Sequence, residues 1–198
     1  MRRKAALLVT MLALVGACSG EGIEDPVVSD PASWPIAALP AIDMSFSEIH
    51  DLDIDKPGTS KAIARVRTGR SQVIAFTRTA GVCGVSADGV RATIDLTRSE
   101  STTQKLNPKV FTTLADDRLV STTFQGGTLK RVTLACGPRT MLLMINTGSG
   151  APPEDVRLDG EASAQVLTGQ YRGQIAVVIA NAADRRQVLP HATVQGVS

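Results

Sequence analysis

Apolar and polar residues alternate with a period of two along most of the chain after residue 60. This spacing places successive apolar side chains on one face of a β-strand, whereas an amphipathic helix needs a period near 3.6. The pattern predicts strands at 61–67, 72–77, 82–85, 90–96, 110–115, 118–124, 128–136, 141–146, 174–181 and 187–194. Residues 154–167 fit either a short helix, which Gly160 would weaken, or two irregular strands.

Turn residues separate these segments and indicate hairpins. Asp88-Gly89 suits a two-residue turn with positive backbone φ angles. Further turns are expected at residues 116–117, 126–127 and 182–184. Short strands at a spacing of roughly 8–12 residues are typical of sandwiches and barrels. We therefore predict an all-β fold, an antiparallel β-sandwich or barrel of roughly 8–10 short strands.

The N-terminus has the organisation of a targeting segment. Three basic residues at positions 2–4 precede an apolar run of 11 residues, 5–15, which is too short to span a bilayer. The run ends in Val15-Gly16-Ala17-Cys18, and this segment resembles the signal peptide and lipobox of bacterial lipoproteins. The resemblance implies cleavage before Cys18 and a diacylglyceryl group on its sulfur, whose two acyl chains would anchor the protein stably to a membrane. A plain secretory signal cut near Ala17 is the alternative.

The resemblance also implies a location and a division of the chain. We expect a signal peptide at 1–17, an acidic Pro-rich arm at 18–59 and a β-sandwich-like domain at 60–198. In an actinobacterial cell the anchor would lie in the outer face of the cytoplasmic membrane. In a double-membrane bacterium, Ser19 would imply sorting to the outer membrane. The apolar residues at 34–36 and 42–49 give the arm a means of docking on the domain.

Charge is distributed unevenly between the arm and the domain. Residues 19–59 carry nine acidic side chains and one basic, while residues 60–198 carry ten acidic and 17 basic. The arm could fold back and neutralise the domain, the domain could attract an anionic envelope polymer or lipid head groups, or a protein partner could complement the charge. Without the signal peptide the chain is nearly neutral, with 18 basic and 19 acidic residues, so its charge gives no case for nucleic-acid binding.

The cysteines predict one disulfide. With Cys18 lipidated, Cys83 and Cys136 remain as an even pair in an oxidising compartment. Neither has a Cys or His neighbour at ligand spacing, and the chain has only two histidines, so we expect no metal site and no cofactor. The three carboxylates of 51–55 lack the glycine and the glutamate of a calcium-binding EF-hand loop.

A group of arginines is the candidate binding site. Two adjacent predicted strands carry the densest positive charge, and their pairing could gather it on one face. Such a face suits phosphate or carboxylate groups, whereas a solvated face opposite the acidic arm is the simpler interpretation. The residues are Arg65, Arg67, Arg70 and Arg78.

No motif in the chain supports catalysis. Residues 146–150 resemble the Asp-Thr-Gly-Ser loop of aspartic proteases, but Asn146 replaces the required carboxylate. A triad of Ser149, Asp184 and His191 has no supporting motif, and Cys83 could act as a nucleophile only if unpaired. We therefore predict a non-enzymatic binding module for an anionic envelope component or another envelope protein. The alternatives are an envelope hydrolase with an unrecognised site and a purely structural envelope protein.

Overall fold

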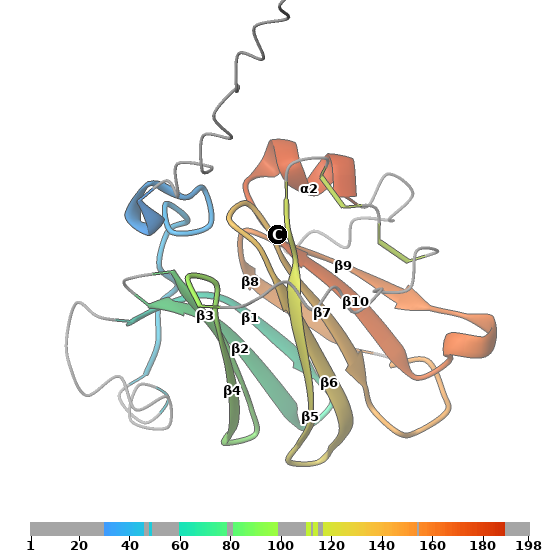
Figure 1. Ribbon diagram of the computed structural model, residues 1–198. Coiled ribbons are helices and arrows are strands. Elements are labelled where there is room, and N and C mark those ends of the chain that lie inside the picture. The colour runs from blue at the N-terminus through green and yellow to red at the C-terminus, as the bar shows by residue number, and fades with distance from the viewer. Residues whose placement is uncertain are drawn as a thin grey trace, which may run out of the picture.

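The computed structural model describes residues 30–45, 48, 60–78, 81–98, 110–111, 113–114, 117–153 and 155–188. Within these residues, ten strands form two five-stranded antiparallel sheets that pack face to face (Figure 1). Sheet A has the order β4-β3-β2-β1-β8 and sheet B the order β5-β6-β7-β10-β9. This architecture confirms the predicted antiparallel sandwich.

The strands of sheet A are β1 (Ser60–Thr68), β2 (Ser71–Arg78), β3 (Val82–Ala87), β4 (Val90–Asp95) and β8 (Val156–Gly160). Those of sheet B are β5 (Val120–Gly126), β6 (Leu129–Cys136), β7 (Met141–Asn146), β9 (Ala162–Leu167) and β10 (Gln174–Ile179). The 3-10 helices η1 (Pro31–Ser33) and η2 (Gly169–Tyr171) and the helix α2 (Ala182–Val188) lie outside the sheets.

The main core lies between the two sheets, and sheet B buries its outer face as well. Along β7, Leu143 and Ile145 point into the main core, whereas Leu142 belongs to a second cluster on the outer face. Phe111 and Val188 are members of that second cluster and cover sheet B from outside. Burial on both faces explains why β7 is apolar from Met141 to Ile145 instead of alternating.

Of residues 154–167, the described positions 155–167 form two strands and no helix, which resolves the alternative left by the sequence. β8 pairs with β1 in sheet A, and β9 pairs with β10 in sheet B, so the chain changes sheet at Gly160 and Glu161. Gly160 has a φ of +88°, and a Cβ there would lie 2.2 Å from the carbonyl oxygen of Ile63. This change of sheet therefore requires glycine for both its conformation and its space.

One predicted strand, 110–115, is wrong, and a second, 187–194, is wrong at its first two residues, while its residues 189–194 lie outside the described part of the chain. Of 110–115, the described residues form no strand; Phe111 and Leu114, three positions apart, pack against sheet B instead. Residues 182–188, expected to be a turn and the start of a strand, form α2, because Asn181 Oδ1 accepts the N–H groups of Ala183 and Asp184 at 3.0 Å and caps the helix. The hairpins expected at 116–117 and 182–184 are therefore absent from the described residues.

One end of the sandwich, which we call the disulfide end, is closed by a covalent bond and by the arm. The predicted disulfide between Cys83 and Cys136 is confirmed; it links β3 to β6 across the core with a Cα–Cα distance of 6.5 Å. Trp34 and Ile36 of the arm are buried in the same core. The N–H of Ile36 donates to the carbonyl of Pro138 at 3.0 Å, which fixes the arm to the β6–β7 turn.

The opposite end, which we call the hairpin end, carries five connections between strands (Figure 1). They are residues 69–70, 88–89, 127–128, 147–155 and 168–173. The first three are tight turns, and Asp88 and Gly89 have φ angles of 47° and 84° as a two-residue hairpin requires. All five connections join antiparallel neighbours or pass between sheets at this one end.

Candidate functional site

Arg65 lies on the outer face of sheet A, and its guanidinium is already occupied. Only 8% of its side chain is exposed. It donates to Asp159 Oδ2 at 3.0 Å, to Glu48 Oε2 at 3.1 Å and to the carbonyl of Asp43 at 2.8 Å. Arg65 thus joins β8 to the arm, and neither terminal nitrogen of its guanidinium is available to an external anion.

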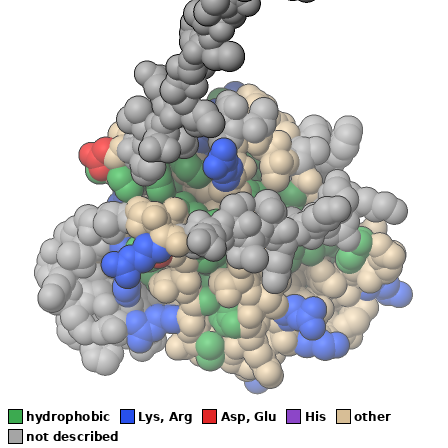
Figure 2. Space-filling view, in the orientation of Figure 1, with side chains coloured by type: hydrophobic (Ala, Val, Ile, Leu, Met, Phe, Trp, Pro, Cys, Tyr) green, Lys and Arg blue, Asp and Glu red, His purple; other side chains and the backbone are tan. Residues whose placement is uncertain are grey.

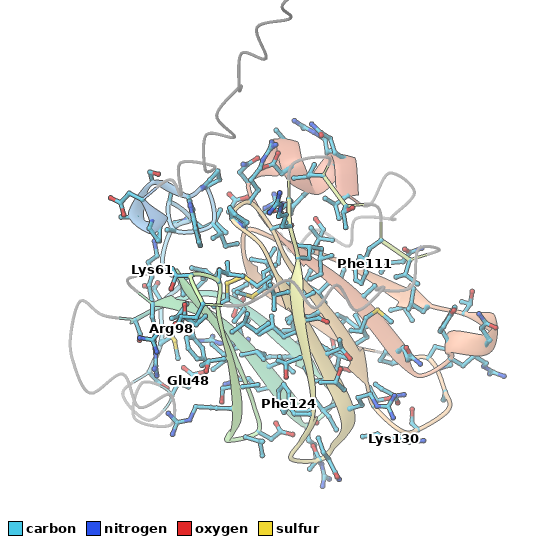
Figure 3. The ribbon with its side chains drawn as sticks, in the orientation of Figure 1. Glu48, Lys61, Arg98, Phe111, Phe124 and Lys130 are labelled. Atoms are coloured by element: carbon cyan, nitrogen blue, oxygen red, sulfur yellow. A yellow bond between two sulfur atoms is a disulfide. The ribbon has the colours of Figure 1, made fainter. Side chains whose placement is uncertain are left out.

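The described part of the arm packs on the same face. The N–H of Ile42 donates to the carbonyl of Ala62 at 3.0 Å, and Met44 packs on the cluster that contains Phe76. Figure 3 shows Glu48 on this side of the molecule. Burial opposes the ionisation of Glu48, but hydrogen bonds from Ser45 and Gln72 and the charge of Arg65 outweigh it and lower the pKa of this carboxyl. This contact matches the interpretation in which the arm folds back and neutralises part of the domain.

The four predicted arginines do not lie together in one patch. Arg67 is 44% exposed and lies 3.3 Å from Asp159, beside Arg65. Arg78 lies over the ring of Phe76, 5.6 Å from its centroid, at the far end of β2. Arg67 pairs with Gln72 in the sheet, six residues before Arg78, so roughly 20 Å separates the two arginines along the strand. Arg70 lies in the β1–β2 turn and is exposed.

Two buried carboxylates lie at the disulfide end, where Arg139 connects them. Its backbone N–H donates to Asp117 Oδ1 at 3.2 Å and its guanidinium to Asp184 Oδ1 at 2.6 Å. The hydroxyl of Thr140 also donates to Asp117, and the amide of Asn181 donates to Asp184 at 2.8 Å. Burial raises the pKa of Asp117, although the hydrogen bonds from Thr140 and Arg139 act in the opposite direction. These bonds hold the β6–β7 turn and α2 in place, which is a structural role.

The structure separates the residues that a catalytic interpretation would need together. Ser149 lies in the 147–155 connection at the hairpin end and donates to the carbonyl of Ala151. Asp184 lies at the disulfide end, bonded to Arg139, and His191 is outside the described residues, as is Cys18. Cys83 is in the disulfide and offers no thiol.

Carboxylates and cations are placed differently across the described residues. Ten Lys and Arg side chains are exposed: Arg67, Arg70, Arg91, Arg98, Arg118, Lys130, Arg131, Arg157, Arg172 and Arg186. Four carboxylates are exposed: Asp30, Asp43, Asp88 and Asp155. The remaining described acids are less exposed and each has a bonded partner: Glu48, Asp95, Asp117, Asp159, Glu161 and Asp184. Among the described residues, therefore, most acids bond to neighbouring groups and most of the exposed charged side chains are basic.

Several of these cations lie at the hairpin end, and we call four of them the basic rim: Arg70, Lys130, Arg131 and Arg172. None of the four forms an ion pair within the described part of the chain. Figure 2 shows Lys and Arg side chains along the lower part of the molecule, where the hairpin end lies. Sequence reasoning missed all but Arg70, although the basic pair directly after the predicted turn at 126–127 was a usable signal.

The exposed acids near the rim are already bonded. Asp88 accepts the N–H of Gln72 at 2.8 Å and both the N–H and the hydroxyl of Thr128, at 3.2 and 2.5 Å. Burial opposes its ionisation, yet these hydrogen bonds prevail and lower its pKa. Asp155 pairs with Arg157 at 3.2 Å. Asp88 thus ties the turns of the two sheets together, and among the described residues the positive charge of the rim remains in excess.

The described residues contain no group of three His, Cys, Asp or Glu side chains that could hold a metal ion. In the same part of the chain no helix is both long and apolar enough to cross a membrane.

The chain matches no protein-family model, no curated protein and no solved structure. Its function must therefore be argued from its own residues.

Proposed function

We propose that this protein is an extracytoplasmic, lipid-anchored binding module for an anionic component of the cell envelope, without catalytic activity of its own. The placement of charge is the observation that carries the proposal: ten exposed cations face solvent against four exposed carboxylates in the described residues. An excess of one sign on the surface draws an oppositely charged partner and speeds its encounter.

The proposed location depends on the sequence and on the disulfide. The segment Val15-Gly16-Ala17-Cys18 supplies the resemblance to lipoproteins. The Cys83–Cys136 bond supports a compartment outside the cytoplasm, because disulfides persist mainly in oxidising environments. Labelling of intact cells with a fatty-acid analogue tests the anchor: the wild-type chain should take up label and Cys18→Ser should not. Equal labelling of both chains would overturn the anchor.

Co-sedimentation with purified envelope fragments tests the binding. The probe is the chain from residue 18 onward carrying Cys18→Ser, which keeps it free of lipid while leaving the arm intact. The arm must stay, because Trp34 and Ile36 are part of the core. Binding at low salt that weakens steeply in high salt is the expected result. Absence of sedimentation at low salt would exclude an anionic envelope component as the partner.

A further inference from the structure

We propose that the basic rim is the binding surface of this module and that it takes an extended polyanion that carries successive phosphate groups, held on the side away from the membrane. This inference rests on the proposed function and adds to it the surface, the ligand class and the orientation.

Hydrogen bonds and a close approach of two loops bring the connections of sheet B together beneath the rim. The N–H and the hydroxyl of Thr147 both donate to the carbonyl of Gly173, at 2.9 and 3.0 Å. A Cβ added at Gly148 would lie 3.2 Å from Cβ of Lys130, so the lysine stem lies along this loop. Three connections of sheet B thus meet in one surface, with Lys130 and Arg172 on it.

Register and a cross-sheet hydrogen bond place the other two cations on the same end. Arg131 pairs with Asn146, which pairs with Gln174, so Arg131 lies about 10 Å from the strand that follows Arg172. Ser71, the neighbour of Arg70, shares a hydrogen bond of 2.5 Å with Thr128, two residues before Lys130. The rim therefore spans both sheets, which stand roughly 10 Å apart.

The spacing and the type of these side chains favour a polymeric anion over a single ion as the ligand. Cations spread over 10 Å or more cannot all contact one phosphate, but successive units of a polymer can reach them in turn. Three of the four are arginines, whose planar forks bind phosphate oxygens in pairs. Tyr171, the aromatic residue next to Arg172, packs against the outer cluster of sheet B and is half-buried, so this ring is not fully exposed for stacking on a sugar.

The entry point of the chain sets the orientation. Pro31 and Trp34 lie against Gly81 in the β2–β3 turn, which belongs to the disulfide end (Figure 1). The eight residues of β2 make this end roughly 26 Å distant from the hairpin end. The described chain therefore begins at the end opposite the rim, which favours presenting the rim away from an anchor at Cys18 and toward a polymer.

Two triple variants with the same loss of charge test the surface. The rim variant carries Lys130→Gln, Arg131→Gln and Arg172→Gln; the matched control carries Arg98→Gln, Arg118→Gln and Arg186→Gln, exposed cations elsewhere. Each chain is titrated with inorganic polyphosphate, with orthophosphate and with phosphatidylglycerol vesicles, after circular dichroism has shown that it is folded. We expect the rim variant to bind polyphosphate at least tenfold more weakly than the wild type, and the slope of its log affinity against log salt concentration to become shallower by roughly two. The control variant should lose less than threefold in affinity.

The remaining outcomes separate this inference from the proposed function. Equal losses in both variants would show that total charge and not the rim binds. Orthophosphate binding as tight as polyphosphate would overturn the extended ligand. Rim-dependent binding to vesicles in preference to polyphosphate would overturn the outward orientation. A wild-type chain that sediments with envelope fragments yet ignores polyphosphate would overturn the ligand class alone, whereas failure to bind either would overturn the proposed function as well.

Discussion

The two ends of the sandwich use charged residues in opposite ways. At the disulfide end, Asp117 and Asp184 are buried, and Arg139 bonds to both. At the hairpin end, Lys130 and Arg131 are exposed and have no ion pair within the described residues. A buried charge must be matched by a partner, whereas an exposed one is solvated by water and remains available. The first end is thus built to hold the fold, and the second is free to contact something else.

The largest expected effect concerns the bond that defines the disulfide end. The double change Cys83→Ala and Cys136→Ala should reduce the free energy of unfolding by about 4 kcal/mol, because the bond restricts a long segment of the unfolded chain. The cysteines are 53 residues apart. Chemical denaturation of the two proteins measures the difference. A loss below about 1 kcal/mol would mean that the arm and the core hold this end without the bond.

The next effect compares one ion pair from each end. Asp184→Ala should cost about 3 kcal/mol, because it leaves Arg139 and Asn181 facing a buried space. Asp184 is 3% exposed, whereas the partners Asp155 and Arg157 at the hairpin end are 60% and 68% exposed. Asp155→Ala should therefore cost less than about 1 kcal/mol. Similar losses for the two variants, measured by urea unfolding, would remove the distinction between the ends.

A third comparison uses pH, since one aspartate at each end has a shifted pKa. The pKa of Asp117 is raised, so its contribution to stability is complete below the unfolded value of about 4 and is lost as the pH rises through the folded pKa. The pKa of Asp88 is lowered, so its contribution is present above about pH 4 and is lost as the pH falls through the folded pKa.

The variants Asp117→Asn and Asp88→Asn should reveal these opposite slopes. Subtracting each variant's unfolding free energy from that of the wild type, at steps between pH 3 and 7, isolates the aspartate. The difference for Asp117 should shrink as the pH rises, and the difference for Asp88 should grow. Slopes of the same sign would show that the two carboxyls have similar surroundings.

The smallest effect is expected at the rim itself. Lys130→Gln, Arg131→Gln and Arg172→Gln together should change the free energy of unfolding by less than about 0.5 kcal/mol, because these side chains make no ion pair in the described residues. Thermal unfolding of the variant beside the wild type measures it. A clear destabilisation would show that the rim supports the fold and would weaken its assignment as a free surface.

Local sequence patterns predicted most of the sandwich, because β-strands obey a short-range rule. Alternation identified β1, and the Asp88-Gly89 pair identified the β3–β4 hairpin with its positive φ angles. The same reasoning failed at 110–115, since apolar residues there cover a sheet without joining it. It also failed at α2, where the helix-capping Asn181 is a usable signal but the pattern places it at the end of the predicted strand 174–181.

The site was less predictable, because its members are distant in sequence. Arg65 is 17 residues from Glu48 and 94 from Asp159, and no local pattern joins three such residues. Lys130 and Arg131 could have been found, since they follow a correctly predicted turn. Arg172 could not, because its place beside the 147–155 connection depends on how sheet B is ordered.

The position of β8 also determines how the protein can fold. β1 to β4 are contiguous in the chain, but β1 pairs along its other edge with β8, whose residues follow about 90 positions later. During N-to-C synthesis, the hydrogen-bonding edge of β1 therefore stays open until nearly the whole chain is available. Closing so distant a pair makes the final step slow. A partly made chain would be the species most prone to pair with its neighbours.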